Sequence, residues 1–173
     1  MLKNKTSEDK TGLLGSVGQD FYGDLYASLL EKEDVVPIFE QCEKVNTGVC
    51  CVFCHNRDRG HLTDLGASTL ISKEFVQRVW ESLSQVELVY TELFILKHRR
   101  EVVYMLADLA LNDDRLFGFN LPSHYFIETY FEDIKTLWET ADVAFANAAE
   151  ALLFGRKLGI QVKINHFIRF KFF

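Results

Sequence analysis

The chain has 173 residues, of which 48% are hydrophobic and 25% are charged, and this composition excludes a fully disordered protein. Fifteen Phe residues and only two Pro residues favour long helices that pack around large apolar rings. The net charge of −6 argues against a dedicated nucleic-acid-binding protein, and the sequence contains no run of 18 apolar residues to span a membrane.

The start of the chain predicts its location and domain organisation. Residues 1–10 are polar and lack the apolar stretch of a secretory signal, so we expect an intracellular, cytoplasmic protein with reduced cysteines. The chain has no internal repeat, low-complexity tract or Gly/Ser linker. We therefore expect a flexible tail over residues 1–11 and a single globular domain over residues 12–173.

The first part of that domain carries short apolar segments separated by turn signals. In chain order we expect a loop over residues 12–18, a helix over 20–32, a second short helix over 37–44, a strand over 49–53 and a loop over 55–64. Pro37 suits the first turn of the second helix. The apolar segment 49–53 has the length of a buried strand.

The longest helical pattern begins at Ser72, which can cap a helix. Apolar side chains then recur at steps of three and four, at Val76, Val79, Leu83, Val86, Tyr90 and Leu93. This stripe moves to a different face after Leu93, so the pattern predicts a break or kink near residues 97–101. After a loop over residues 112–122, Ser123 caps the strongest predicted helix, which covers residues 123–152 and packs antiparallel to the preceding one.

The last segment changes to a period of two. Apolar and polar residues alternate over residues 160–173, which predicts a half-buried strand with one basic face. Its partner is either the strand over residues 49–53 or a strand of another chain. The fold class that follows is mainly α, with α+β as the alternative: a helical hairpin or small helical bundle with a minor β element from the C-terminal strand.

All four cysteines lie within thirteen residues, close to two histidines. The two-residue spacing of Cys51 and Cys54 lets two thiolates reach one zinc ion, and Cys42 and His61 complete a tetrahedral set. The second interpretation is a group of buried structural thiols, because cysteine inside a strand is a small apolar residue. The sequence therefore leaves the cofactor open, with zinc as the candidate.

Two basic segments raise the question of nucleic-acid binding. The first contains Lys97, Arg99 and Arg100, and the second contains Lys163, Arg169 and Lys171 among Phe residues. Cations interleaved with aromatic rings are typical of single-stranded nucleic-acid binding. A solvated helix junction and a charge match within an oligomer are the alternative explanations, and we favour these two.

No phosphate-binding glycine loop, nucleophile elbow or zinc-protease helix occurs in the sequence. We therefore expect a non-enzymatic binding or regulatory protein that acts through protein–protein contacts or self-association. In one version of this hypothesis, a metal ion bound at the Cys/His cluster cross-links that part of the chain. One alternative is a nucleic-acid-binding protein. A second alternative is a thiol- or metal-dependent enzyme centred on Cys51, Cys54, His55 and His61.

Overall fold

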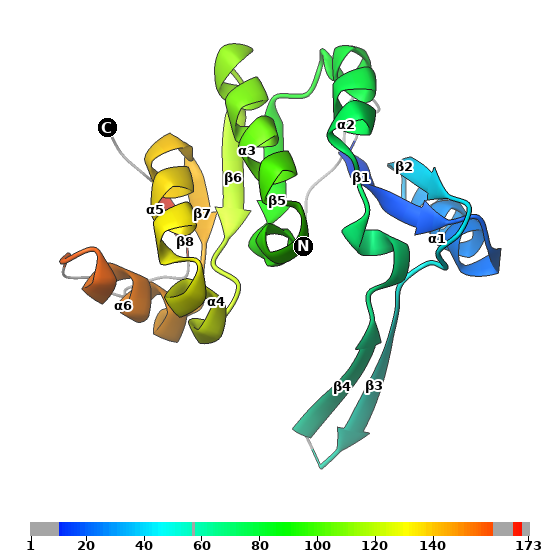
Figure 1. The fold of residues 1–173 in the computed structure, drawn as a ribbon. Helices are drawn as coiled ribbons and strands as arrows, with labels where there is room; N and C mark the ends of the chain where they lie inside the picture. The colour runs from blue at the N-terminus through cyan, green and yellow to red at the C-terminus, as the bar shows by residue number, and fades with distance from the viewer. Residues whose placement is uncertain (1–10, 57, 161–167, 171–173) are drawn as a thin grey trace. The chain divides into compact units, whose positions relative to one another are not determined.

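The computed structural model describes residues 11–56, 58–160 and 168–170. They belong to two compact units, residues 1–75 and 76–173, which we describe separately (Figure 1). The single globular domain over residues 12–173 stays a prediction, and most of the expected tail over residues 1–11 lies outside the described residues. Within the described part of the chain, no helix is both long and apolar enough to cross a membrane.

The first unit begins with a β–α–β arrangement. It contains β1 (Thr11–Gly18), α1 (Phe21–Lys32) and β2 (Val35–Cys42), and the two strands pair in parallel from Thr11↔Val35 to Gly18↔Cys42. Asp20 caps α1 by accepting a hydrogen bond from Gly23 N at 2.9 Å, so the predicted helix over residues 20–32 is confirmed. The same carboxylate accepts bonds from the backbone N–H and the hydroxyl of Thr47.

Two predictions in this unit are wrong. Residues 12–18 form β1 instead of a loop, and residues 37–44 lie largely in β2 instead of a helix. Pro37 is tolerated because, among the described residues, β2 pairs with β1 alone, and proline occurs on edge strands. Around it, the β-branched Val35, Val36 and Ile38 favour the extended backbone.

A β-hairpin follows, formed by β3 (Val49–His55) and β4 (Asp58–Asp64) in antiparallel register. The strand predicted over residues 49–53 is confirmed, but all of its residues are exposed instead of buried. The loop predicted over residues 55–64 is wrong, because most of it is the second strand of this hairpin. A short 3₁₀ turn, Gly66–Thr69, then packs against β1, where the Ser16 hydroxyl donates to Ala67 O at 2.6 Å.

The second unit is built around a sheet with the strand order β5–β6–β7–β8. Its strands are β5 (Leu88–Glu92), β6 (Leu116–Asn120), β7 (Val143–Phe145) and β8 (Ile168–Phe170). Helix α2 (Lys73–Trp80) precedes the sheet. The helices that follow are α3 (Leu96–Asn112), α4 (His124–Thr129), α5 (Phe131–Thr140) and α6 (Ala148–Lys157). The first three strands are parallel, and β8 runs antiparallel to β7. Helices α3 and α5 lie over one face of the sheet in Figure 1.

Burial explains why this face is covered. Phe117 and Phe119 of β6 are at most 1% exposed, and the side chains of α3 and α5 that share this core include Val102, Val103, Leu106, Ile134 and Leu137. Removing such apolar area from water contributes about 25 cal/mol per Å², which is the main force holding the helices on the sheet. The core therefore fixes the ends of the strands, where the candidate site lies.

The long helices predicted in this unit are interrupted. Residues 72–111 form α2, β5 and α3, although the predicted kink is confirmed at Arg99, whose φ of −139° and ψ of 52° are not helical. Residues 112–122 contain β6 instead of being only a loop. The helix predicted over residues 123–152 divides into α4, α5, β7 and the first half of α6, although Ser123 caps α4 as predicted.

The predicted fold class, a mainly helical hairpin or bundle, is therefore wrong, and the chain has an α/β fold. Short parallel strands that are buried lack the alternation of a half-exposed strand, so their apolar residues also fit a helical stripe. Of the predicted C-terminal strand over residues 160–173, residues 168–170 form β8. Its partner is β7 instead of the strand over residues 49–53, and residues 161–167 and 171–173 lie outside the described part.

Candidate active site

The parallel strands β5, β6 and β7 end at one edge of the sheet, which we call the carboxyl edge. Glu92 pairs with Asn120, and Asn120 pairs with Phe145, so the three strand ends lie in one row. In open α/β sheets, ligands bind outside the carboxyl ends of the strands. The segments that follow these strands are therefore the first place to look for an active site.

The two residues that follow β5 are a buried leucine, Leu93, and an exposed phenylalanine, Phe94. The Leu93 side chain is fully buried, and its backbone N–H donates to Oδ1 of Asn120 at 3.3 Å, which joins the ends of β5 and β6. Phe94, the next residue, is 48% exposed. An exposed aromatic ring on a fixed backbone offers a face on which a planar ligand can stack.

Phe94 belongs to an aromatic cluster made of Phe94, Tyr125, Phe126 and Tyr130. The ring of Phe126 lies at the centre, with its centroid 4.9 Å from that of Phe94, 5.9 Å from that of Tyr125 and 5.1 Å from that of Tyr130. Phe126 is buried, whereas Tyr125 is 66% exposed. The cluster is thus anchored in the core and presents open rings beside the carboxyl edge.

After β7, Asn147 begins α6 with a capping box. Its Oδ1 accepts from Glu150 N at 2.9 Å, and its own N–H donates to the Glu150 carboxylate at 3.0 Å. The N-terminus of this ten-residue helix therefore lies at the carboxyl edge, where its partial positive charge favours anions. Glu92 and Glu150 are carboxylates that this edge offers to a hard cation.

A basic turn, residues 97–100, lies at the start of α3. Arg100 forms an ion pair with the buried carboxylate of Asp133, which also accepts a hydrogen bond from the Tyr104 hydroxyl at 2.8 Å. The hydrogen bond with Asp133 raises the pKa of Arg100, and burial together with the bond to Asp133 raises the pKa of Tyr104. This network attaches the start of α3 to the first turn of α5.

The four residues of the predicted zinc site are distributed over three strands. Cys42 ends β2, Cys51 and Cys54 lie on β3, and His61 lies on β4. Cys51 and Cys54 are three residues apart on a strand, so their side chains leave opposite faces of the hairpin. Among the described residues, no group of three or more His, Cys, Asp or Glu side chains could hold a metal ion, so the expectation of zinc binding is corrected.

The thiols of the hairpin are exposed instead of buried. Cys50, which was not part of the predicted set, accepts a hydrogen bond from the Thr63 hydroxyl at 3.2 Å, and its Sγ lies 3.9 Å from Nδ1 of His61. Cys50 and His61 share one face of the hairpin, because Cys50 pairs with Thr63 and His61 lies two residues from Thr63 on β4. The structure thus places His61 next to Cys50, a cysteine whose position in the sequence did not suggest a contact with a histidine.

The two predicted basic segments have different outcomes. Lys97, Arg99 and Arg100 lie together at the carboxyl edge, within the basic turn. Arg169 belongs to β8, and Lys163 lies outside the described residues, as does Lys171. The sequence analysis did not identify the segments that follow β6 and β7 as parts of a site. It assigned residues 112–122 to a loop and residues 123–152 to a single helix. The Asn147-x-x-Glu150 spacing of a capping box was the signal in the sequence that could have located the start of α6.

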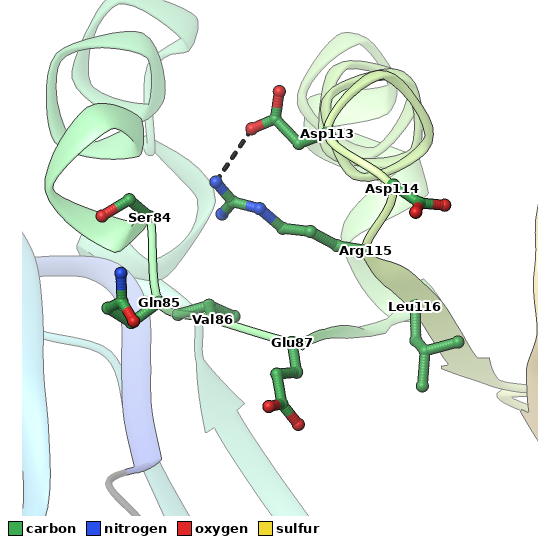
Figure 2. Close-up of a pocket in the computed structure, with 8 residues that line it drawn as sticks. All are labelled: Ser84, Gln85, Val86, Glu87, Asp113, Asp114, Arg115 and Leu116. Carbon is green, nitrogen blue, oxygen red and sulfur yellow. Dashed lines mark hydrogen bonds and ion pairs between the residues drawn. The ribbon is translucent and has the colours of Figure 1, made fainter.

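A groove lies at the opposite, amino edge of the sheet (Figure 2). In its wall the Arg115 guanidinium donates to Leu83 O and to Asp113 Oδ2, both at 2.8 Å, and stacks over the Trp80 ring at 4.4 Å. Trp80 Nε1 donates to the same oxygen of Asp113 at 2.8 Å. These groups satisfy one another, so this groove holds a structural network, and the carboxyl edge remains the candidate active site.

A family model described as pfkB family carbohydrate kinase matches residues 6–168. The chain belongs to this family. It is 26% identical over 160 residues to an adenosine kinase of Dictyostelium discoideum, covering 91% of this chain and 46% of that protein, and 27% identical over 157 residues to an adenosine kinase of Schizosaccharomyces pombe, covering 88% and 46%. The chain thus spans about half the length of the curated relatives it matches.

Solved structures show the same fold. An adenosine kinase of Trypanosoma brucei brucei has a TM-score of 0.78 at 24% identity, covering 87% of this chain and 46% of that one. An uncharacterised sugar kinase of Pyrococcus horikoshii has a TM-score of 0.73 at 24% identity, covering 90% and 53%. Both likenesses support the α/β architecture described above.

Family membership corrects the predicted function. A non-enzymatic binding or regulatory protein is wrong, because the family consists of carbohydrate kinases and indicates an enzyme. The nucleic-acid-binding and thiol-dependent alternatives are replaced for the same reason. The prediction from the sequence depended on short motifs such as the glycine-rich phosphate loop, which this chain lacks. The candidate residues at the carboxyl edge instead come from three separate segments, which no short motif joins.

Proposed function

We propose that this chain forms the acceptor-binding part of a kinase that transfers a phosphoryl group from a nucleoside triphosphate to a hydroxyl group of a nucleoside. Family membership supports kinase chemistry, and the similarity to two adenosine kinases makes adenosine the first acceptor to test. The observation that carries the proposal is the exposed ring of Phe94 beside the carboxyl edge. A nucleobase can stack on this ring, whereas a simple sugar has no aromatic plane to match it.

Phosphoryl transfer requires little covalent chemistry from individual side chains. Phosphoryl transfer depends on holding the two reactants in line and on stabilising the charge of the transferred group. The anchored strand ends provide the first requirement, because Leu93 N and Asn120 Oδ1 fix β5 against β6. The positive end of α6 contributes to the second.

Mg²⁺ accompanies kinase reactions, and it neutralises charge on the phosphates when bound. It takes oxygen ligands, commonly one or two carboxylates together with phosphate oxygens of the nucleotide. Glu92 and Glu150 at the carboxyl edge are carboxylates of this kind, and either one would hold the ion together with phosphate oxygens. The described residues gather no larger set of metal ligands, so phosphate oxygens and water would complete the coordination.

Removal of the Phe94 ring tests the proposal. We expect Phe94→Ala to weaken adenosine binding about tenfold or more, because stacking of one base on an aromatic side chain contributes ~1–3 kcal/mol. Isothermal titration calorimetry measures the change. Phe21→Ala is the matched control, because Phe21 is 72% exposed on α1 in the other unit and should leave adenosine affinity unchanged.

A parallel titration with ribose separates a nucleoside site from a sugar site. We expect ribose to bind more weakly than adenosine and to lose less affinity than adenosine in Phe94→Ala, since ribose has no aromatic plane to stack on the ring. Equal affinity of the parent and Phe94→Ala proteins for adenosine would contradict the proposal. So would the absence of any adenosine binding by the parent chain. An intracellular, cytoplasmic location stays a prediction from the sequence.

A further inference from the structure

We propose that Cys50 is a site of reversible modification by a small anionic disulfide such as glutathione disulfide. Strand β3 of the hairpin carries three exposed cysteines, Cys50, Cys51 and Cys54. Among the described residues, polar side chains lie within hydrogen-bonding distance of the sulfur of Cys50 and not of the other two. The site lies outside the carboxyl edge and does not depend on the proposed kinase function.

The register of the hairpin decides which side chains share a face with Cys50. Residues directly opposite each other in an antiparallel pair lie on one face, and so do residues two positions apart on a strand. Thr63 is directly opposite Cys50, and His61 is diagonally opposite it. Cys51 lies on the other face. Cys54 returns to the face of Cys50 but is four residues further along the strand, away from both neighbours.

The two neighbours form a directed chain of polar groups through the thiol. The Thr63 hydroxyl donates to Sγ at 3.2 Å, and Sγ lies 3.9 Å from Nδ1 of His61. In the tautomer of His61 that carries its proton on Nε2, Nδ1 accepts from the thiol. A thiolate at this position then keeps two donors, the hydroxyl and the imidazolium N–H. Because the thiolate is the form of cysteine that attacks disulfides, this arrangement favours reaction at Cys50.

The modification is a thiol–disulfide exchange. The Cys50 thiol gives its proton to His61, and the thiolate attacks one sulfur of glutathione disulfide. A new S–S bond joins Cys50 to one glutathione, the original S–S bond breaks, and the second glutathione leaves as a thiolate that takes up the proton from His61. Cys50 is thereby oxidised and one glutathione is reduced. Excess free thiol reverses the step.

The charge on this face of the hairpin favours an anionic disulfide. Arg59 lies on the same face, two residues from His61, and in the described part of the chain neither side chain forms an ion pair. The two carboxylates of β3 and β4, Asp58 and Asp64, lie on the opposite face. Glutathione disulfide carries carboxylate groups, so it is attracted to a face that presents a cation without a neighbouring acid.

The test exposes the reduced chain to glutathione disulfide, stops the reaction with acid at short times and locates the mixed disulfides by tandem mass spectrometry. We expect Cys50 to react about tenfold faster than Cys51 and Cys54, because those thiols lack a neighbouring base. These two cysteines are internal controls, since all three are exposed on the same strand. Equal rates at the three cysteines would overturn the proposal.

A pair of histidine variants tests the assigned base. His61→Gln should lower the rate at Cys50 towards the rates at Cys51 and Cys54. His55→Gln is the matched control, because His55 lies on the other face of the same hairpin and should leave the rate unchanged. An undiminished rate at Cys50 in His61→Gln would contradict the proposal. Circular dichroism checks that both variants fold, and if His61→Gln does not, the comparison of the three cysteines in the parent chain decides.

The neutral hydroxyethyl disulfide tests the selection by charge. Arg59→Gln should slow the reaction of Cys50 with glutathione disulfide about threefold and leave its reaction with the neutral disulfide unchanged. An equal effect on both reactions would overturn the assigned ligand class. So would a covalent dimer of two chains linked through Cys50 in place of the mixed disulfide, which electrophoresis without reducing agent detects.

Discussion

At the scale of single residues, Tyr90 shows how the sheet shapes its surroundings. Its ring lies in an edge-to-face arrangement with Phe145, with centroids 5.7 Å apart, across Gly118 on the strand between them. A Cβ atom at Gly118 would lie 2.7 Å from Cγ1 of Val143, so glycine allows the side chains of the flanking strands to approach. Burial, with added effects from the charge and hydrogen bond of Glu92, raises the pKa of Tyr90 to about 12.

This pKa predicts how stability depends on pH. The unfolded tyrosine loses its proton near its ordinary pKa of 10.0, whereas the folded protein keeps it until about 12, so the folded state binds more protons between these values. The free energy of unfolding should therefore fall as pH rises from 10 towards 12. Denaturant unfolding at several pH values should show a shallower decline in Tyr90→Phe than in the parent.

The exposed Tyr22→Phe variant is the control for this experiment. If it flattens the decline as much as Tyr90→Phe does, the environment of Tyr90 is not the cause. At the same scale, the sequence located the basic turn but could not identify its partners. Asp133 is 33 residues from Arg100 and 29 from Tyr104, and only the packing of α5 on α3 brings them together.

At the scale of elements, local signals located the caps but not the strands. Asp20 and Ser123 begin helices where the sequence predicts them, because capping depends on residues within one turn. The strands β5, β6 and β7 were assigned to helix or loop. Each has only three to five residues, and β6, with three consecutive buried residues, lacks the alternation that would reveal it.

The capping box of α6 gives an element-scale prediction. Asn147→Ala removes the side-chain acceptor for Glu150 N, and we expect a loss of about 1 kcal/mol in the free energy of unfolding. Asn147→Ser keeps an acceptor and should lose less. Chemical denaturation followed by circular dichroism measures both variants, and equal stability of Asn147→Ala and the parent would show that the cap is not needed.

At the scale of the whole molecule, contacts between distant segments hold the second unit together. The Arg115 side chain is 9% exposed and joins Trp80, Leu83 and Asp113, so it links the residues after α2 to the end of α3 and the start of β6. Trp80 donates to Asp113 as well. These contacts fix the amino edge of the sheet, opposite the candidate active site.

Arg115→Met keeps most of the side-chain volume but removes these hydrogen bonds. We expect a loss of ~1–3 kcal/mol in the free energy of unfolding, because Leu83 O and Asp113 lose a charged donor. Tryptophan fluorescence follows the transition well, since both tryptophans of the chain, Trp80 and Trp138, lie in this unit. Arg156→Met at the exposed end of α6 is the control, and an equal loss there would contradict the assigned role.

The sequence by itself determined the features that depend on neighbouring residues: the helix that begins at Asp20, the cap at Ser123, the strand over residues 49–53 and the kink near Arg99. Tertiary structure decided the rest. Whether an apolar segment becomes helix or strand depends on the surface that buries it, and the helical stripe through Tyr90 gave way to a place in a parallel sheet. The carboxyl edge exists only because that sheet aligns the ends of three strands.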